Sequence, residues 1–209
     1  TSVQTLSGAI NHTGATTITG GTLKLDGAAT IASTPSITLG SGAGLDVSTL
    51  SSPLSLGASQ ALRSSSTGAN ATGTVTTALA NDLTLSAAGL VFPGYGGANA
   101  SSSTNAPLTV NGASAGELKL NGAPVTVNTT SMLAVGTYVL VAKGGSAIVT
   151  GTPGPLTITG SGVNGTATLA VTGDQWSAPE KGLWQFEYAE AGEPFCYHCL
   201  SPVTPRCPP

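Results

Sequence analysis

The sequence predicts an all-β protein built as a parallel β-solenoid of short strands. Short segments alternate apolar and polar residues and stop at Gly, Asn, Pro or Ser. One phrase recurs as LKLDGA (23–28), LTVNGA (108–113) and LKLNGA (118–123), which indicates a repeat architecture. The apolar positions hold small aliphatic residues, and aromatic residues are scarce before residue 174, which suits the narrow interior of a solenoid.

Each expected strand is three to seven residues long and rich in β-branched residues, as a pleated, half-buried surface favours. No window carries the i, i+3, i+4, i+7 apolar stripe of a helix. In chain order the strands are expected within residues 17–26, 36–40, 44–48, 53–57, 72–77, 82–87, 89–93, 107–112, 117–122, 124–130, 137–144, 147–151, 155–160 and 167–173.

An antiparallel β-sandwich is the alternative architecture. In a sandwich the Asn-Gly and Asp-Gly pairs would be hairpin turns. In a solenoid the same pairs would be corners, because both residue types tolerate the left-handed backbone region. The shortage of aromatic residues to anchor a sandwich core favours the solenoid.

The composition changes near residue 174, so we expect a β-solenoid body over 1–173 and a C-terminal Cys- and Pro-rich appendage over 174–209. The appendage holds both Trp, all three Cys and six of the nine aromatic residues. Its segment LWQFEYAE (183–190) alternates, and is expected to be a cap, a tail, or a strand donated to a neighbouring copy. Assembly or cross-link candidates are Trp184, Phe186 and Tyr188 on one side of that strand, followed by Cys196, Cys199 and Cys207.

The stretch LSGAINHTGATTITGGTLKLDGAATI (6–31) resembles the autotransporter-associated β-strand repeat of bacterial passenger domains. Residues 6–8, 13–23 and 25 fit the LSGxNxxTGxTTIxGGTL phrase closely, whereas His12 stands where that repeat often has an aromatic residue. The likeness extends loosely over 1–173 and is absent from 174–209. It implies a secreted or cell-surface β-solenoid without catalytic residues in the repeat.

Composition narrows the partners and the location. The net charge of −3, with only 7% charged residues, forms no basic patch, so no nucleic-acid partner is expected. The most apolar run, 132–142, is too short to span a membrane. Because the first 195 residues lack Cys, an oxidising exterior is favoured, and we expect a secreted, extracellular or cell-surface protein.

Candidate chemistry in the body is sparse, so no catalytic, cofactor-binding or metal site is predicted. GSGVNG (160–165) has the spacing of a dinucleotide loop but leads into a strand, so it is expected to be a turn. The acids are Asp26, Asp46, Asp82 and Glu117; Asp26 and Asp46 could meet across one turn, although solvated corners are the simpler interpretation. His12 is the body's one histidine, and nothing marks it as an activating base.

The tail pattern of Cys196, His198, Cys199 and Cys207 leaves two interpretations open. It contains four possible zinc ligands, but adjacent His198 and Cys199 are awkward for one tetrahedral ion. A disulfide with one thiol left for an intermolecular link is favoured in a secreted chain. A c-type haem is excluded, because CYHCL departs from the C-x-x-C-H motif.

These observations predict a non-enzymatic structural protein, either a fibre or matrix subunit or an adhesin-like stalk, that self-assembles into filaments by strand pairing. Open ends of stacked strands are templates for further pairing. A carbohydrate- or ice-binding solenoid is the alternative, with a surface glycan as the partner in the first case. Thr-x-Thr recurs at Thr17/Thr19, Thr72/Thr74/Thr76 and Thr157/Thr159, and a flat ladder of Thr on one face could bind ice. A polysaccharide-active enzyme would need two converging carboxylates.

Overall fold

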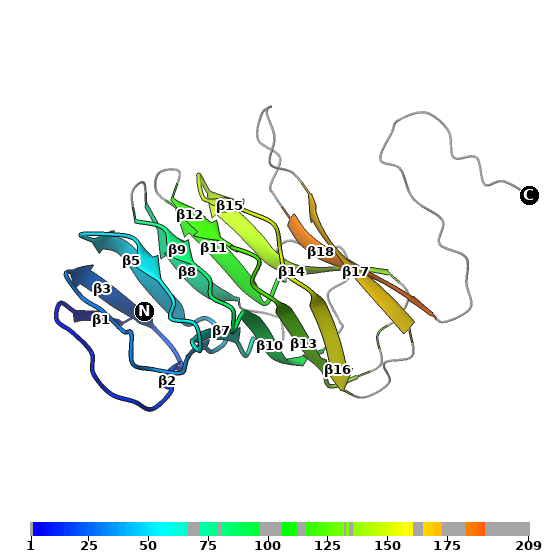
Figure 1. Cartoon of the computed structure of the whole chain (residues 1–209), viewed down its shortest axis with the longest axis horizontal. Helices are drawn as coiled ribbons and strands as arrows, with labels where there is room; N and C mark the ends of the chain where they lie inside the picture. Colours follow the sequence, from blue (N-terminus) through cyan, green and yellow to red (C-terminus); the bar gives the residue numbers. More distant parts are fainter. Residues whose placement is uncertain are drawn as a thin grey trace, which may run out of the picture.

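The strands follow one another in coils that stack along one axis from the N-terminus (Figure 1). The computed structural model describes residues 2–66, 72–78, 81–96, 106–112, 116–131, 133, 136–160, 165–172 and 183–190, of which 136–137, 165–172 and 183–190 are described as backbone only. Over these ranges the regular structure is β-strand, and no helix long and apolar enough to cross a lipid bilayer occurs in them.

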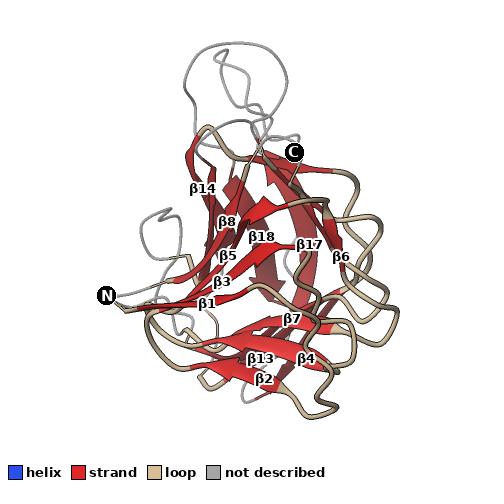
Figure 2. Ribbon diagram, turned by 90° about the vertical axis from the view of Figure 1, so that its left-hand side faces the viewer, coloured by secondary structure: helices blue, strands red, loops and turns tan. Residues whose placement is uncertain are grey.

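The strands form three sheets around a common interior, seen along the stack in Figure 2. The eight-stranded sheet runs in the order β1 (Val3–Leu6), β3 (Thr22–Gly27), β5 (Gly44–Leu50), β8 (Gly73–Thr77), β11 (Leu108–Gly112), β14 (Gly136–Gly145), β18 (Leu183–Glu190) and β17 (Gly165–Thr172). The six-stranded sheet comprises β2 (Thr16–Ile18), β4 (Ser36–Leu39), β7 (Ala61–Ser64), β10 (Leu90–Tyr95), β13 (Val125–Thr129) and β16 (Leu156–Gly160). The four-stranded sheet comprises β6 (Leu54–Ser55), β9 (Leu83–Thr84), β12 (Glu117–Lys119) and β15 (Ile148–Thr150).

From the third coil on, the chain passes through the eight-stranded sheet, then the four-stranded sheet, then the six-stranded sheet. In the first two coils an isolated parallel bridge between Ala9 and Thr30 takes the place of the four-stranded sheet. Val3 pairs with Thr22, so the first coil advances by 19 residues. Leu108 pairs with Val141, so a late coil advances by 33. The coils therefore lengthen toward the C-terminus.

The prediction of a parallel β-solenoid is confirmed, and the sandwich alternative is wrong for the described strands. All pairings among the strands of the six coils are parallel. The Asn-Gly pair at Asn121 and Gly122 has φ angles of 51° and 72°, and the Ala123 N–H donates to the Leu120 carbonyl at 2.8 Å. This turn joins β12 to β13, which lie in different sheets, so it is a corner and not a hairpin.

The interior consists of aliphatic columns, because residues in register on successive coils point the same way. One column runs Leu23, Leu45, Val75 and Val110 through the eight-stranded sheet. Its Leu45, Val75 and Val110 have no exposed surface. Every residue inside the column therefore packs against the coil before it and the coil after it.

Buried polar side chains tie neighbouring coils together at the corner between the four- and six-stranded sheets. The Gln60 Nε2 amide donates to the Ile31 carbonyl at 2.6 Å, and the Ser86 hydroxyl donates to the Gln60 carbonyl at 2.9 Å. Both side chains are buried, so these hydrogen bonds replace water for backbone carbonyls that would otherwise lose it.

The longer coils accommodate larger side chains than the sequence led us to expect. Phe92, Tyr95 and Tyr138 are buried, and the Tyr95 and Tyr138 rings meet edge to face with centroids 6.2 Å apart and planes at 79°. Burial, reinforced by the neighbouring Tyr138, raises the pKa of the Tyr95 phenol well above its ordinary value. The aromatic residues of the body thus fill the widened C-terminal half.

The C-terminal end of the eight-stranded sheet departs from the solenoid pattern. Strand β18 lies between β14 and β17 and pairs antiparallel with both. The eight-stranded sheet consequently extends two strands beyond β14, whereas the six-stranded sheet stops at β16 and the four-stranded sheet at β15. This end of the stack is uneven.

Candidate functional site

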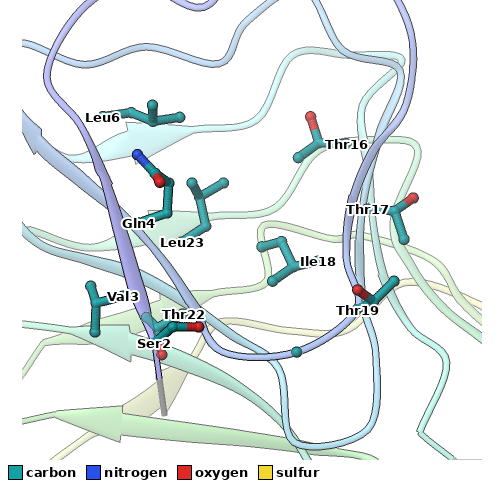
Figure 3. A pocket seen from close by; sticks show the side chains of 11 residues that line it. Ser2, Val3, Gln4, Leu6, Thr16, Thr17, Ile18, Thr19, Thr22 and Leu23 are labelled. Carbon is teal, nitrogen blue, oxygen red and sulfur yellow. The ribbon is translucent and has the colours of Figure 1, made fainter.

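A hollow of about 410 Å³ opens at the N-terminal end of the stack, between β1 and β2. Figure 3 shows Leu6 and Leu23 on one side of it and Ile18 pointing into it from the other, whereas Thr17 on the same strand as Ile18 points away. The hollow is the uncovered end of the solenoid interior. Hydroxyl and amide groups line its rim, contributed by Ser2, Gln4, Thr16, Thr19 and Thr22.

Two inward columns change from apolar to polar at this end. Gln4 heads the column that continues as Leu23 and Leu45, and Thr16 heads the column that continues as Ile37 and Leu62. Gln4 is exposed, and its amide donates to the Thr5 carbonyl at 3.3 Å. A polar residue at the end of an aliphatic column reduces the apolar area left open to water.

The rim of the hollow is formed by two sheet edges that lack charge. Among the described strands, β1 pairs only with β3 and β2 only with β4, so each presents a row of backbone N–H and C=O groups. Neither VQTL nor TTI contains Lys, Arg, Asp, Glu or Pro, the residues that usually protect an edge strand. Val3 on β1 is 59% exposed. Within the described ranges, no other large hydrophobic side chain is classed as exposed.

His12 lies next to this end and has a hydroxyl partner that the sequence did not reveal. Its Nε2 is 2.9 Å from the Thr16 Oγ1, and Thr16 lines the hollow. Buried Thr34 accepts the Thr16 backbone N–H at 3.0 Å, and its hydroxyl lies 2.7 Å from the Gly14 carbonyl. This chain of hydrogen bonds fastens the loop between β1 and β2 to the second coil.

The structure does not bring Asp26 and Asp46 into register. Asp46 pairs with Lys24, and Asp26 with Thr49, across an irregularity between β3 and β5. The Asp46 carboxylate accepts the Ser48 N–H at 2.9 Å, so it stabilises the irregular backbone. Both acids are half-buried and lie within strands, Asp46 inside β5 and Asp26 near the end of β3, so the interpretation of them as solvated corner residues is wrong for Asp46.

Asp82 and Glu117, in contrast, converge on one amine. The Lys119 Nζ is 2.8 Å from an Asp82 oxygen and 3.8 Å from a Glu117 oxygen. Asp82 also accepts the Glu117 N–H at 2.9 Å, and Glu117 accepts the Thr150 hydroxyl at 3.0 Å. The hydrogen bond to Asp82 and the two negative charges raise the pKa of Lys119, which keeps it a cation. The cluster links three coils and offers no free amine nucleophile.

The assembly candidates of the appendage fall into two groups. Trp184, Phe186 and Tyr188 lie on β18, where Phe186 pairs with both Tyr138 and Leu169. The strand predicted over 183–190 thus coincides with β18, and it pairs within its own chain. Cys196, Cys199 and Cys207, together with His198, lie outside the described residues, so the disulfide and zinc interpretations stay predictions. In the ranges that the structure describes, no three His, Cys, Asp or Glu gather as a metal site.

Two further predictions concern loops and faces. GSGVNG begins at the end of β16 and ends at the start of β17, but its residues 161–164 lie outside the described ranges, so the turn stays a prediction. On the outer face of the six-stranded sheet, Thr17 pairs with Thr38 and Thr126 with Thr157, but Arg63 and Val91 separate the two pairs. This column is not a continuous Thr ladder.

No family model, curated protein or solved structure matches the chain.

Proposed function

We propose that this protein is a non-enzymatic structural β-solenoid, secreted or displayed at a cell surface, that acts as a spacer or fibre subunit by associating with itself. The proposal is supported by the resemblance of residues 6–31 to the repeat of passenger domains and by the near absence of Cys and charge in the body. The observation that carries it is the stack of parallel strands, in which buried polar side chains join one coil to the next.

The use of polar side chains supports a mechanical role. Gln60 and Ser86 hydrogen-bond to the coil before each of them, and Asp82, Glu117 and Lys119 join the coils on either side. Hydrogen bonds and ion pairs that cross coils resist separation of the stack along its axis. In an enzyme some of these groups would instead converge on a cleft for substrate.

The dimensions of the stack bear on its use as a spacer. Coils repeat at about 4.8 Å, the spacing between paired strands, so the six described coils extend about 30 Å. Each further coil of the same kind would lengthen the rod by the same step. Association of copies would lengthen it where their sheet edges pair.

The decisive measurement is the size of the purified chain across a wide range of concentrations, by light scattering with size-exclusion chromatography and by negative-stain electron microscopy. Dimers or filaments, with or without reductant, would support the proposal. Monomers at all concentrations would contradict it, and a screen against surface glycans would then test the binding-module alternative. Assembly that occurs without reductant and is lost when reductant is added would assign the contact to the cysteines.

A further inference from the structure

We infer that the outer face of the six-stranded sheet binds a polysaccharide that bears carboxylates, with Arg63 as the group that recognises the acid. This inference goes beyond the proposed structural role and does not depend on self-association. It gives the stack a ligand, held along its side. Figure 2 shows β2, β4, β7 and β13 of this sheet together on one side of the interior.

The middle of this face presents hydroxyl groups that the described part of the chain does not use. Residues that pair in register on successive coils form one outward column, and it runs Thr17, Thr38, Arg63, Val91, Thr126 and Thr157. Within the described ranges, the four threonine hydroxyls of this column make no hydrogen bond. Each can therefore donate to or accept from a ligand.

Arg63 lies in the middle of the column, and no described carboxylate neutralises it. Among the described residues its guanidinium makes no hydrogen bond or ion pair. The side chain is half-buried and lies in register between Thr38 and Val91. Neighbouring side chains thus replace part of the water around a group with five donors. A carboxylate restores those hydrogen bonds best, because its two oxygens match the planar guanidinium.

The distribution of charge over the three sheets favours an anion on this face. Within the six strands of the six-stranded sheet, all of them described, Arg63 is the one charged residue. Asp26 and Asp46 belong to the eight-stranded sheet. Asp82 and Glu117 hold Lys119 at the four-stranded sheet. An anionic partner therefore meets a positive group here and no opposing carboxylate from these strands.

A single cation among hydroxyl groups favours a polysaccharide over other polyanions. Nucleic acids carry a charge on every unit and bind through several cations at once. An acidic polysaccharide can place one carboxylate on Arg63 and exchange hydrogen bonds between its own hydroxyls and the threonines. Those threonines recur from coil to coil at the strand spacing of about 4.8 Å. Val91, next in register after Arg63, offers an apolar contact to the C–H groups of a sugar ring.

The first test measures binding of acidic oligosaccharides to the full chain by isothermal titration calorimetry. The ligands are oligomers from polygalacturonate, alginate and hyaluronate. The carboxyl-reduced form of each is its control, because an alcohol replaces the acid on the same ring. We expect at least one acidic oligomer to bind, and its reduced form to bind about tenfold more weakly or worse. If none of the three binds more tightly than its control, the inference is overturned.

The second test assigns the binding to Arg63. Arg63→Gln should raise the dissociation constant about tenfold or more. Arg63→Lys keeps the charge but cannot bind both carboxylate oxygens in the same plane, so its affinity should lie between those of the wild type and Arg63→Gln. The matched control is Lys24→Gln, which removes the same charge from a half-buried position on the eight-stranded sheet and should leave the affinity unchanged.

The third test concerns the hydroxyls. Thr126→Val replaces a hydroxyl of the column by a methyl group, and we expect the dissociation constant to rise about two- to tenfold. Thr74→Val makes the same change at a half-buried position of the eight-stranded sheet and should have no effect. Far-UV circular dichroism of every variant should match the wild type, so that a loss of affinity is not a loss of fold.

The remaining outcomes separate this inference from its rivals. Equal losses from Arg63→Gln and Lys24→Gln would show that binding follows net charge, and would overturn it. Tighter binding to polyphosphate than to any acidic oligosaccharide, or binding to ice without binding to an oligosaccharide, would also overturn it. Light scattering on the same preparations tests self-association independently, so the proposed function and this inference can each fail while the other stands.

Discussion

Replacing Leu45 by Ala should destabilise the fold far more than the same change at Leu23, although both residues belong to one interior column. Leu45 has no exposed surface and lies in register between Leu23 and Val75. Leu23 is only partly buried and lines the hollow at the end of the stack. The comparison therefore tests whether stability depends on contacts with both neighbouring coils.

Buried Leu→Ala changes cost about 2–5 kcal/mol, and more where the cavity cannot collapse. Enclosed between two coils, Leu45 belongs in the upper half of that range, about 3–4 kcal/mol. At Leu23 water already reaches part of the side chain, so roughly half as much, about 1–2 kcal/mol, is expected. The expected difference is about 2 kcal/mol.

Urea unfolding followed by far-UV circular dichroism measures both free energies of unfolding. The proteins should be compared at the same several concentrations, because self-association would add a concentration-dependent term to the free energy of unfolding. Equal losses at the two positions, or a loss below about 1 kcal/mol at Leu45, would refute the stacked-column reasoning.

Two further predictions concern pH and the corners. Burial raises the pKa of Tyr95, so ionisation of its phenol favours the unfolded chain. The stability contributed by the neutral phenol is complete below pH 10 and falls above it, by about 1.4 kcal/mol at pH 11. Urea unfolding at pH 8 and pH 11 should show that Tyr95→Phe removes this pH-dependent part. Gly89→Ala should lower the melting temperature by more than Gly122→Ala. Both glycines have positive φ, but only at Gly89 would the new Cβ collide with the Pro124 carbonyl of the next coil. Equal melting temperatures for the two variants would contradict this inter-coil contact.

The fold class could be predicted because a solenoid repeats a local pattern. Alternation along segments such as LTVNG predicts which residues face inward. Corner residues such as Asn121 and Gly122 can be recognised because Asn and Gly tolerate positive φ. The coil lengths could not be predicted. Extra residues enter at corners, where the backbone need not pair, so nothing local shows that Gly44 pairs with Thr74 while Val3 pairs with Thr22.

The candidate site was largely hidden in the sequence. Strand β1 has an exposed Gln4 in its inward column and so shows no apolar alternation. Which strand becomes an edge depends on the completed stack and not on its own residues. Strand β18 was recognisable by alternation, but its antiparallel place between β14 and β17 is a long-range property. The contact of His12 with Thr16 depends on the path of a loop, for which no sequence pattern exists.

Unequal coil lengths also affect how accurately each strand pairs with the correct neighbouring strand while the chain folds. A solenoid of identical repeats can pair a strand with the wrong coil and lose little, because each repeat offers the same columns. Here an advance of 19 residues at the first coil and 33 at a late one means that a strand shifted by one coil would stretch or crowd its connection. It would also set the buried Tyr95 and Tyr138 against aliphatic sites too small for them. The irregular repeat thus disfavours structures in which a strand pairs with the wrong coil. The lengthening of the coils therefore specifies one order in which the strands stack.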